Sequence, residues 1–133
     1  MHNINSNETP DKYIIIKNQH ITSFISDKTF LEGTLVTFID CEIKVDIFSI
    51  FSRIVIRDCI FLKPYKIENK SIKQLSFFYK NTKPDINYNL ENLEIEYISP
   101  DGEVNVDIDF KKTNKSIPKI NYKNISTINI IIK

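Results

Sequence analysis

Acidic side chains are concentrated in one stretch of the chain, where they alternate with apolar residues. Residues 84–110 contain eight carboxylates and no lysine or arginine, whereas residues 63–83 and 111–133 contain six lysines each. Within 93–97 and 103–110, apolar and polar residues alternate. The carboxylates expected on the polar face are Glu94, Glu96, Glu103, Asp107 and Asp109. Such a group can bind a basic partner, hold a divalent cation, or be neutralised by this chain's own lysines.

Two of these three uses remain open at the level of sequence. Asp107 and Asp109 offer an Asp-x-Asp spacing, but no EF-hand or other ligand loop surrounds them, so we expect no metal site. Like charges directly across neighbouring strands destabilise a sheet, so the carboxylates need a counter-charge. Either the lysine-rich flanks or a basic protein partner would supply it.

Residues typical of catalytic sites are few. The histidines are His2, in the polar N-terminal stretch, and His20, in a short polar connection. The cysteines, Cys41 and Cys59, occupy apolar strand positions, which favours buried structural thiols. With only two glycines in the chain, no phosphate-binding loop can be written. We therefore expect no catalytic residues, no cofactor and no enzymatic activity.

The elements that carry the carboxylates are expected to be strands. The chain contains no alanine and is rich in isoleucine, phenylalanine and tyrosine, which suits strands better than helices. The alternating segments flank Ser99-Pro100-Asp101-Gly102, in which proline suits the second turn position and glycine can supply a positive φ. This pattern predicts a β-hairpin over 93–110 and favours an antiparallel sheet or sandwich. In a hairpin the polar faces coincide, so the five carboxylates would lie together and exposed.

A second pattern predicts a different all-β architecture. Residues 37–43 (TFIDCEI) and 55–61 (VIRDCIF) are similar and lie 18 residues apart. Continuing this offset aligns Val36, Ile54 and Ile72, and also Cys41, Cys59, Phe77 and Ile95. The Asp-Cys segments resemble the degenerate coils of pentapeptide-repeat and other short parallel β-helix proteins over about residues 34–97. That resemblance implies a short β-solenoid with coils of about 18 residues. The antiparallel sheet and the solenoid both remain open.

Length and composition set the remaining expectations. A chain of 133 residues is the size of one domain, which we place at 12–133 after a loose, polar tail at 1–11. No apolar stretch is long enough to span a membrane, and we see no signal-peptide pattern. We therefore expect a cytoplasmic protein with reduced thiols. The net charge of +1 does not favour nucleic-acid binding.

Together these observations predict a non-enzymatic protein-binding module that presents an acidic β-face to a basic partner. In size, class and charge the chain is similar to bacterial immunity or antitoxin-like inhibitors, which would make the partner a toxin. One alternative is a structural subunit that self-associates through apolar edges at 13–17 or 125–132. Another is a small hydrolase whose site is assembled in space around His20.

Overall fold

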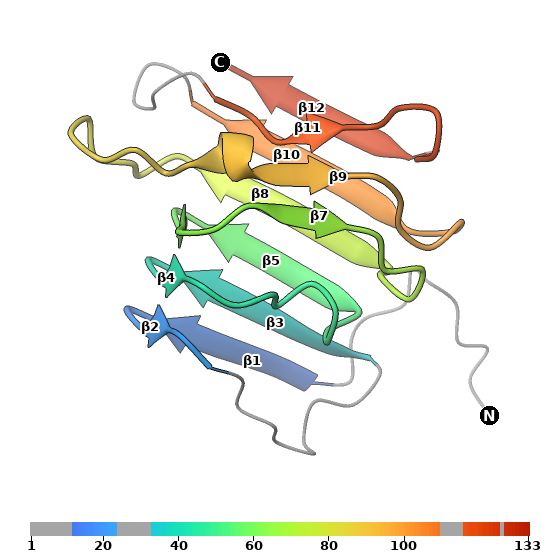
Figure 1. The fold of residues 1–133 in the computed structure, drawn as a ribbon, viewed down its shortest axis with the longest axis horizontal. Helices are drawn as coiled ribbons and strands as arrows, with labels where there is room; N and C mark the ends of the chain where they lie inside the picture. The colour runs from blue at the N-terminus through green and yellow to red at the C-terminus, as the bar shows by residue number, and fades with distance from the viewer. Residues whose placement is uncertain (1–11, 24–32, 110–115, 126) are drawn as a thin grey trace.

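The chain forms a parallel β-solenoid of about five turns. The computed structural model describes residues 12–23, 33–109, 116–125 and 127–133 (Figure 1), so the proposed tail at 1–11 lies outside the described residues. Within those ranges, helical structure is confined to the single-turn 3-10 helix η1 (Leu90–Asn92). None of the described residues forms a helix long and apolar enough to cross a membrane.

Each turn of the solenoid contributes strands to separate parallel sheets. Sheet A contains, in spatial order, β1 (Lys12–Lys17), β3 (Thr34–Ile39), β5 (Arg53–Arg57), β8 (Gln74–Tyr79), β10 (Glu103–Ile108) and β12 (Ile128–Ile132). Sheet B contains β2 (His20–Ile21), β4 (Glu42–Ile43) and β6 (Ile60–Phe61). Sheet C contains β7 (Tyr65–Ile67), β9 (Leu93–Ile95) and β11 (Lys119–Ile120). Figure 1 shows sheet A behind, with the short strands of B and C in front.

Stacking in register produces continuous apolar columns between these layers. One inward column of sheet A consists of Ile14, Val36, Ile54, Leu75, Val104 and Ile128. The next inward column consists of Ile16, Phe38, Ile56, Phe77, Val106 and Ile130. The central members of both columns are almost fully buried, whereas the isoleucines at both ends are only partly covered. Burial of these columns is the main stabilising contribution to a solenoid, because each coil packs only against its neighbours.

The corner between sheets A and B explains the repeated Asp-Cys pair. Asn18, Asp40 and Asp58 follow β1, β3 and β5 and adopt φ values of 55°, 52° and 50°. Asparagine and aspartate tolerate this left-handed conformation better than other non-glycine residues. The N–H groups of these three residues donate to the neighbouring coil at 3.0–3.1 Å, so the hydrogen-bond ladder continues through the corner.

The predicted hairpin at 93–110, and with it the antiparallel architecture, is wrong. Every strand pair in the described residues is parallel, and β9 and β10 belong to different sheets. The Ser99–Gly102 turn carries the chain from sheet C to sheet A instead of folding it back on itself. The Pro-Asp-Gly pattern led to the wrong prediction because a corner in a solenoid uses the same turn residues as a hairpin.

The predicted repeat offset is correct for one step only. Leu35 pairs with Arg53, as the offset requires, but Arg53 pairs with Gln74 and Gln74 with Glu103. Each of these two later steps spans more of the sequence than the step before it. The coils therefore differ in length, with register offsets of 22, 18, 21, 29 and 24 residues from β1 to β12, and Ile54 stacks on Leu75 instead of Ile72.

Candidate interaction surfaces

The five predicted partner-binding carboxylates are divided between two sheets. Glu94 lies on β9 and Glu96 follows it directly, so both belong to the sheet C side. Glu103 and Asp107 lie on β10 and Asp109 follows that strand, so these three belong to sheet A. Of the five, Glu94 is exposed and the other four are partly buried. The expectation that all five lie together was wrong because it depended on the hairpin.

Lysines of the chain provide counter-charge for several of these groups. On sheet C, Glu94 stands between Lys66 on β7 and Lys119 on β11 in register, which gives an alternating row of charge. The pKa of Lys66 is raised by its hydrogen bond to Glu68 and by the carboxylates of Glu96 and Glu94. On sheet A, the ammonium of Lys80 lies 2.9 Å from Oδ2 of Asp107. These contacts favour the internal neutralisation that the sequence left open.

Glu96 has a structural role that the sequence did not reveal. Its Oε1 accepts hydrogen bonds from the side-chain amides of Asn121 at 3.0 Å and Asn124 at 3.2 Å. Asn121 Oδ1 in turn accepts the backbone N–H of Lys123, and the N–H of Asn124 donates to the carbonyl of Asn121. Glu96 therefore fixes the turn at 121–124 in the next coil.

That turn forms one wall of an open groove of about 800 Å³, which we call the tyrosine groove. It lies where the chain passes from sheet C to sheet A, and its lining residues are Lys70, Tyr97, Ile98, Ser99, Pro100, Tyr122, Lys123, Asn124 and Ile125. The ammonium of Lys70 sits 5.5 Å from the centre of the Tyr97 ring, a cation–π contact. Tyr122 is 62% exposed. The sequence spacing of these residues did not predict the groove, because they come from two different coils that the fold brings together.

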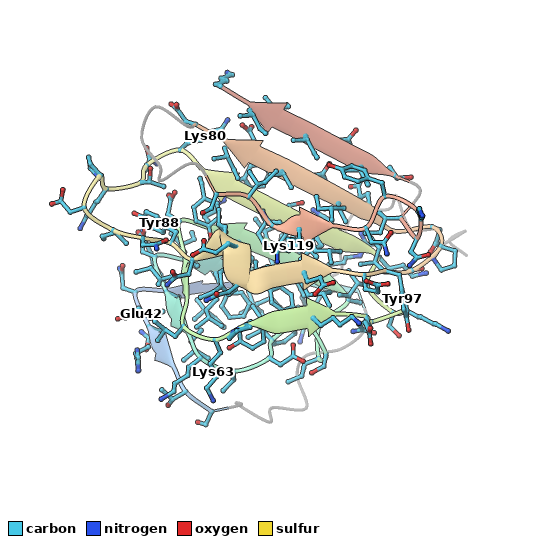
Figure 2. The ribbon with its side chains drawn as sticks, turned by 45° about the horizontal axis from the view of Figure 1, so that its top comes forward. Glu42, Lys63, Lys80, Tyr88, Tyr97 and Lys119 are labelled. Carbon is cyan, nitrogen blue, oxygen red and sulfur yellow. The ribbon has the colours of Figure 1, made fainter. Side chains whose placement is uncertain are left out.

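A second groove, of about 790 Å³, follows the corner between sheets A and B, and we call it the corner groove. It is lined by residues of both charges, among them Asp40, Asp58, Arg57, Lys80 and Lys83. Burial, and to a lesser degree the nearby Asp40, raises the pKa of Asp58, and Oδ1 of Asp58 is buried without a hydrogen-bond partner. Figure 2 shows Tyr88 of the corner groove and Tyr97 of the tyrosine groove on opposite sides of the fold.

Both cysteines are buried and free, as the sequence predicted. The thiol of Cys41 donates to the carbonyls of Ile16 and Ile39 at 3.4 and 3.3 Å. A hydrogen bond with Cys59 lowers the pKa of Cys41 to about 7, whereas burial raises the pKa of Cys59. His20 lies 3.7 Å from Glu42 and is not among the residues that line the corner groove.

The outer strands of sheet A are the third candidate surface. In the described residues, β1 and β12 form its two edges, the segments that the sequence suggested for self-association. Both carry exposed apolar side chains: Tyr13 and Ile15 on β1, and Ile131 and Ile132 on β12. Open edges with apolar side chains are the usual sites of strand addition.

Comparisons with known proteins add no family. No protein-family model matches the chain, and neither does any curated protein or solved structure.

Proposed function

We propose that this protein is a non-enzymatic protein-binding module that pairs a strand of its partner with the open edge of β12. The observation that carries this proposal is the combination of an edge strand with two exposed apolar side chains, one on each face of the strand: Ile131 at 52% and Ile132 at 43% exposure. Strand addition gains affinity from main-chain hydrogen bonds and specificity from alternate side chains.

The hydrogen-bond pattern identifies the free backbone groups on this edge. Lys133 donates its N–H to Ile108, and the carbonyl of Thr127 accepts from Val104. Since bonding direction alternates along a parallel strand, residues 127, 129, 131 and 133 face β10. The N–H and C=O groups of Ile128, Ile130 and Ile132 therefore point toward an incoming strand.

Charge favours an acidic partner strand at this edge. The described residues 116–125 and 127–133 contain Lys119, Lys123 and Lys133 and no carboxylate side chain. A second copy docking head to tail would bring β1, with Lys12 and Lys17, toward the last coil, whose described charged side chains are these lysines, so the charges oppose self-association. A basic partner for the carboxylates of β9 and β10 is less well supported, because lysines of this chain already compensate several of them.

A peptide-binding assay tests the proposal. The probe is a fluorescent, end-capped peptide with the sequence of residues 103–108 (EVNVDI), which already pairs in parallel within sheet A. Its control has lysine in place of both carboxylates. We expect the acidic peptide to bind the whole protein more tightly, and we expect Ile132→Pro to abolish binding because proline removes an outward N–H.

Ile132→Val is the matched control, since it keeps the N–H and a β-branched side chain. Circular dichroism and the urea midpoint establish that both variants are folded. Equal binding of the two peptides, or undiminished binding by a folded Ile132→Pro, would refute the proposal. Sedimentation velocity should show a monomer, and a concentration-dependent dimer lost in Ile132→Pro would favour self-association instead.

A further inference from the structure

The tyrosine groove combines aromatic and cationic side chains. Two tyrosines and two lysines line it, and none of its described lining residues is acidic. Tyr122 exposes most of its ring although its backbone turn is held in place. An exposed aromatic ring on an ordered support is an apolar surface that a partner can cover at low entropic cost.

The support of Tyr122 is built from several hydrogen bonds. Glu96 binds both Asn121 and Asn124, and Asn121 binds the N–H of Lys123. The turn is also tied to sheet C, because the N–H of Asn121 donates to the carbonyl of Ile95 at 2.9 Å. Glu96 is thus a positioning residue: it fixes Tyr122 and Lys123 on one wall while Lys70 and Tyr97 lie in the same groove.

We propose that the tyrosine groove binds an acidic saccharide, with a sugar ring packed on Tyr122 and its carboxylates paired with Lys70 and Lys123. A sugar presents an apolar C–H face that packs on an aromatic ring, and its hydroxyls need amide or hydroxyl partners such as Asn124. Two separated ammonium groups match a ligand with one or two carboxylates.

The same features disfavour a nucleic acid strand. Such a strand carries a phosphate on every nucleotide and needs a continuous basic track. Here the described lining of the groove offers two lysines, which form no such track.

Titration calorimetry and NMR shift mapping on the whole protein provide the test. The probe is a β-1,4-linked trimer of glucuronic acid, and cellotriose is its control because it has the same backbone without carboxylates. We expect the acidic trimer to bind, with tyrosine and lysine signals of the groove shifting and affinity falling as salt is raised. Cellotriose should bind at least about tenfold more weakly, the loss of one or two charge contacts.

Variants locate the binding. Tyr122→Ala should weaken it by about tenfold, the order of one aromatic contact, whereas Tyr13→Ala should leave it unchanged. Tyr13 is an apt control because it is 61% exposed but lies on β1, outside the groove. Glu96→Ala should weaken binding, and Glu96→Gln should restore it because its amide oxygen can still accept from the asparagines.

The outcomes separate this inference from the β12 proposal. Ile132→Pro should leave saccharide binding intact, so either proposal can fail alone. No binding of the acidic trimer, equal binding of cellotriose, or an effect of Tyr13→Ala equal to that of Tyr122→Ala would overturn the saccharide assignment. Tighter binding of a thymidine tetranucleotide or of a tetraglutamate peptide than of the trimer would also overturn it and reassign the groove.

Discussion

Replacing Gly102 with alanine should destabilise the solenoid for a reason that the sequence pattern did not suggest. The sequence assigned this glycine a positive φ, but Gly102 does not adopt one. A Cβ at this position would meet the carbonyl oxygen of Ile72 at 2.5 Å and Cδ1 of Ile98 at 3.0 Å. That carbonyl accepts the N–H of Ser99, whose own carbonyl accepts the N–H of Gly102, so the backbone is held on both sides.

The size of the destabilisation follows from how closely the added Cβ would approach the carbonyl oxygen of Ile72. An ordinary carbon–oxygen contact begins near 3.4 Å, so two hydrogen-bonded backbone segments would have to move apart by most of an ångström. Strain of this kind costs about 1–3 kcal/mol. For a domain of this size each kcal/mol lowers Tm by roughly 3–6 °C. We therefore expect the urea midpoint and Tm of Gly102→Ala to fall clearly below those of the wild type.

Asparagine at the same position distinguishes two reasons for a glycine here: a positive φ, or a close approach of neighbouring backbone. If Gly102 served a positive φ, Gly102→Asn would be tolerated better than Gly102→Ala, since asparagine enters the left-handed region more readily. Because the reason is close approach of backbone, we expect asparagine to be at least as damaging as alanine. Gly33, with φ 95°, is the control at which asparagine should be the better replacement. An unchanged unfolding midpoint for Gly102→Ala would refute the reasoning.

Three further perturbations probe the interior and the corner. Folding raises the pKa of Asp58, so ionisation of this carboxyl group destabilises the folded state as the pH rises above about 4. Asp58→Asn should therefore raise Tm at pH 7 but not at pH 3. An equal gain in Tm at both pH values would contradict this prediction. Tyr79 is fully buried, and its hydroxyl donates a hydrogen bond to the carbonyl of Cys59 at 2.6 Å. Tyr79→Phe should therefore lower the free energy of unfolding in urea by about 1–2 kcal/mol. An unchanged free energy of unfolding would count against this hydrogen bond. A hydrogen bond with Cys59 lowers the pKa of Cys41 to about 7, so Cys59→Ala should raise the pH midpoint of the ultraviolet thiolate absorbance of Cys41 in the folded protein. An unchanged midpoint would exclude that cause.

The strand content and one coil of the solenoid could be predicted from sequence, because they depend on local pattern. The segments 37–43 and 55–61 share an Asp-Cys pair, and the structure uses it at one corner in both coils. The Asp backbone turns left-handed and the Cys side chain points into the core. The 18-residue offset holds only for the step from β3 to β5. Once the loops lengthened after β5, the alignment of Cys59 with Phe77 failed, since Phe77 stacks on Ile56.

The arrangement of the charged residues could not be predicted in the same way. Local alternation places a carboxylate on the outer side of its strand but does not say which strand lies next to it. Glu94 pairs with Lys66 of the preceding coil and Lys119 of the following one, and these sequence separations are set by loop lengths that follow no pattern. The hairpin prediction supplied the wrong neighbours, so it also supplied the wrong surface. The role of Glu96 depends on Asn121 and Asn124, which are similarly distant in sequence.

The loops of irregular length that interrupt the repeat also create the grooves. The backbone ladder of a solenoid requires its strands to keep register, but its corners can accept extra residues without disturbing the columns inside. Residues 80–89, inserted after β8, contribute Lys83 and Tyr88 to the corner groove, and the carbonyl of Tyr88 still accepts the N–H of Phe61 from the coil below. The turn at 121–124 does the same for the tyrosine groove through its bond to Ile95. In both places the inserted segment keeps a ladder contact with the neighbouring coil, which helps to fix its position. Substitutions such as Tyr122→Ala should therefore change binding with little effect on unfolding, whereas core substitutions should change unfolding first.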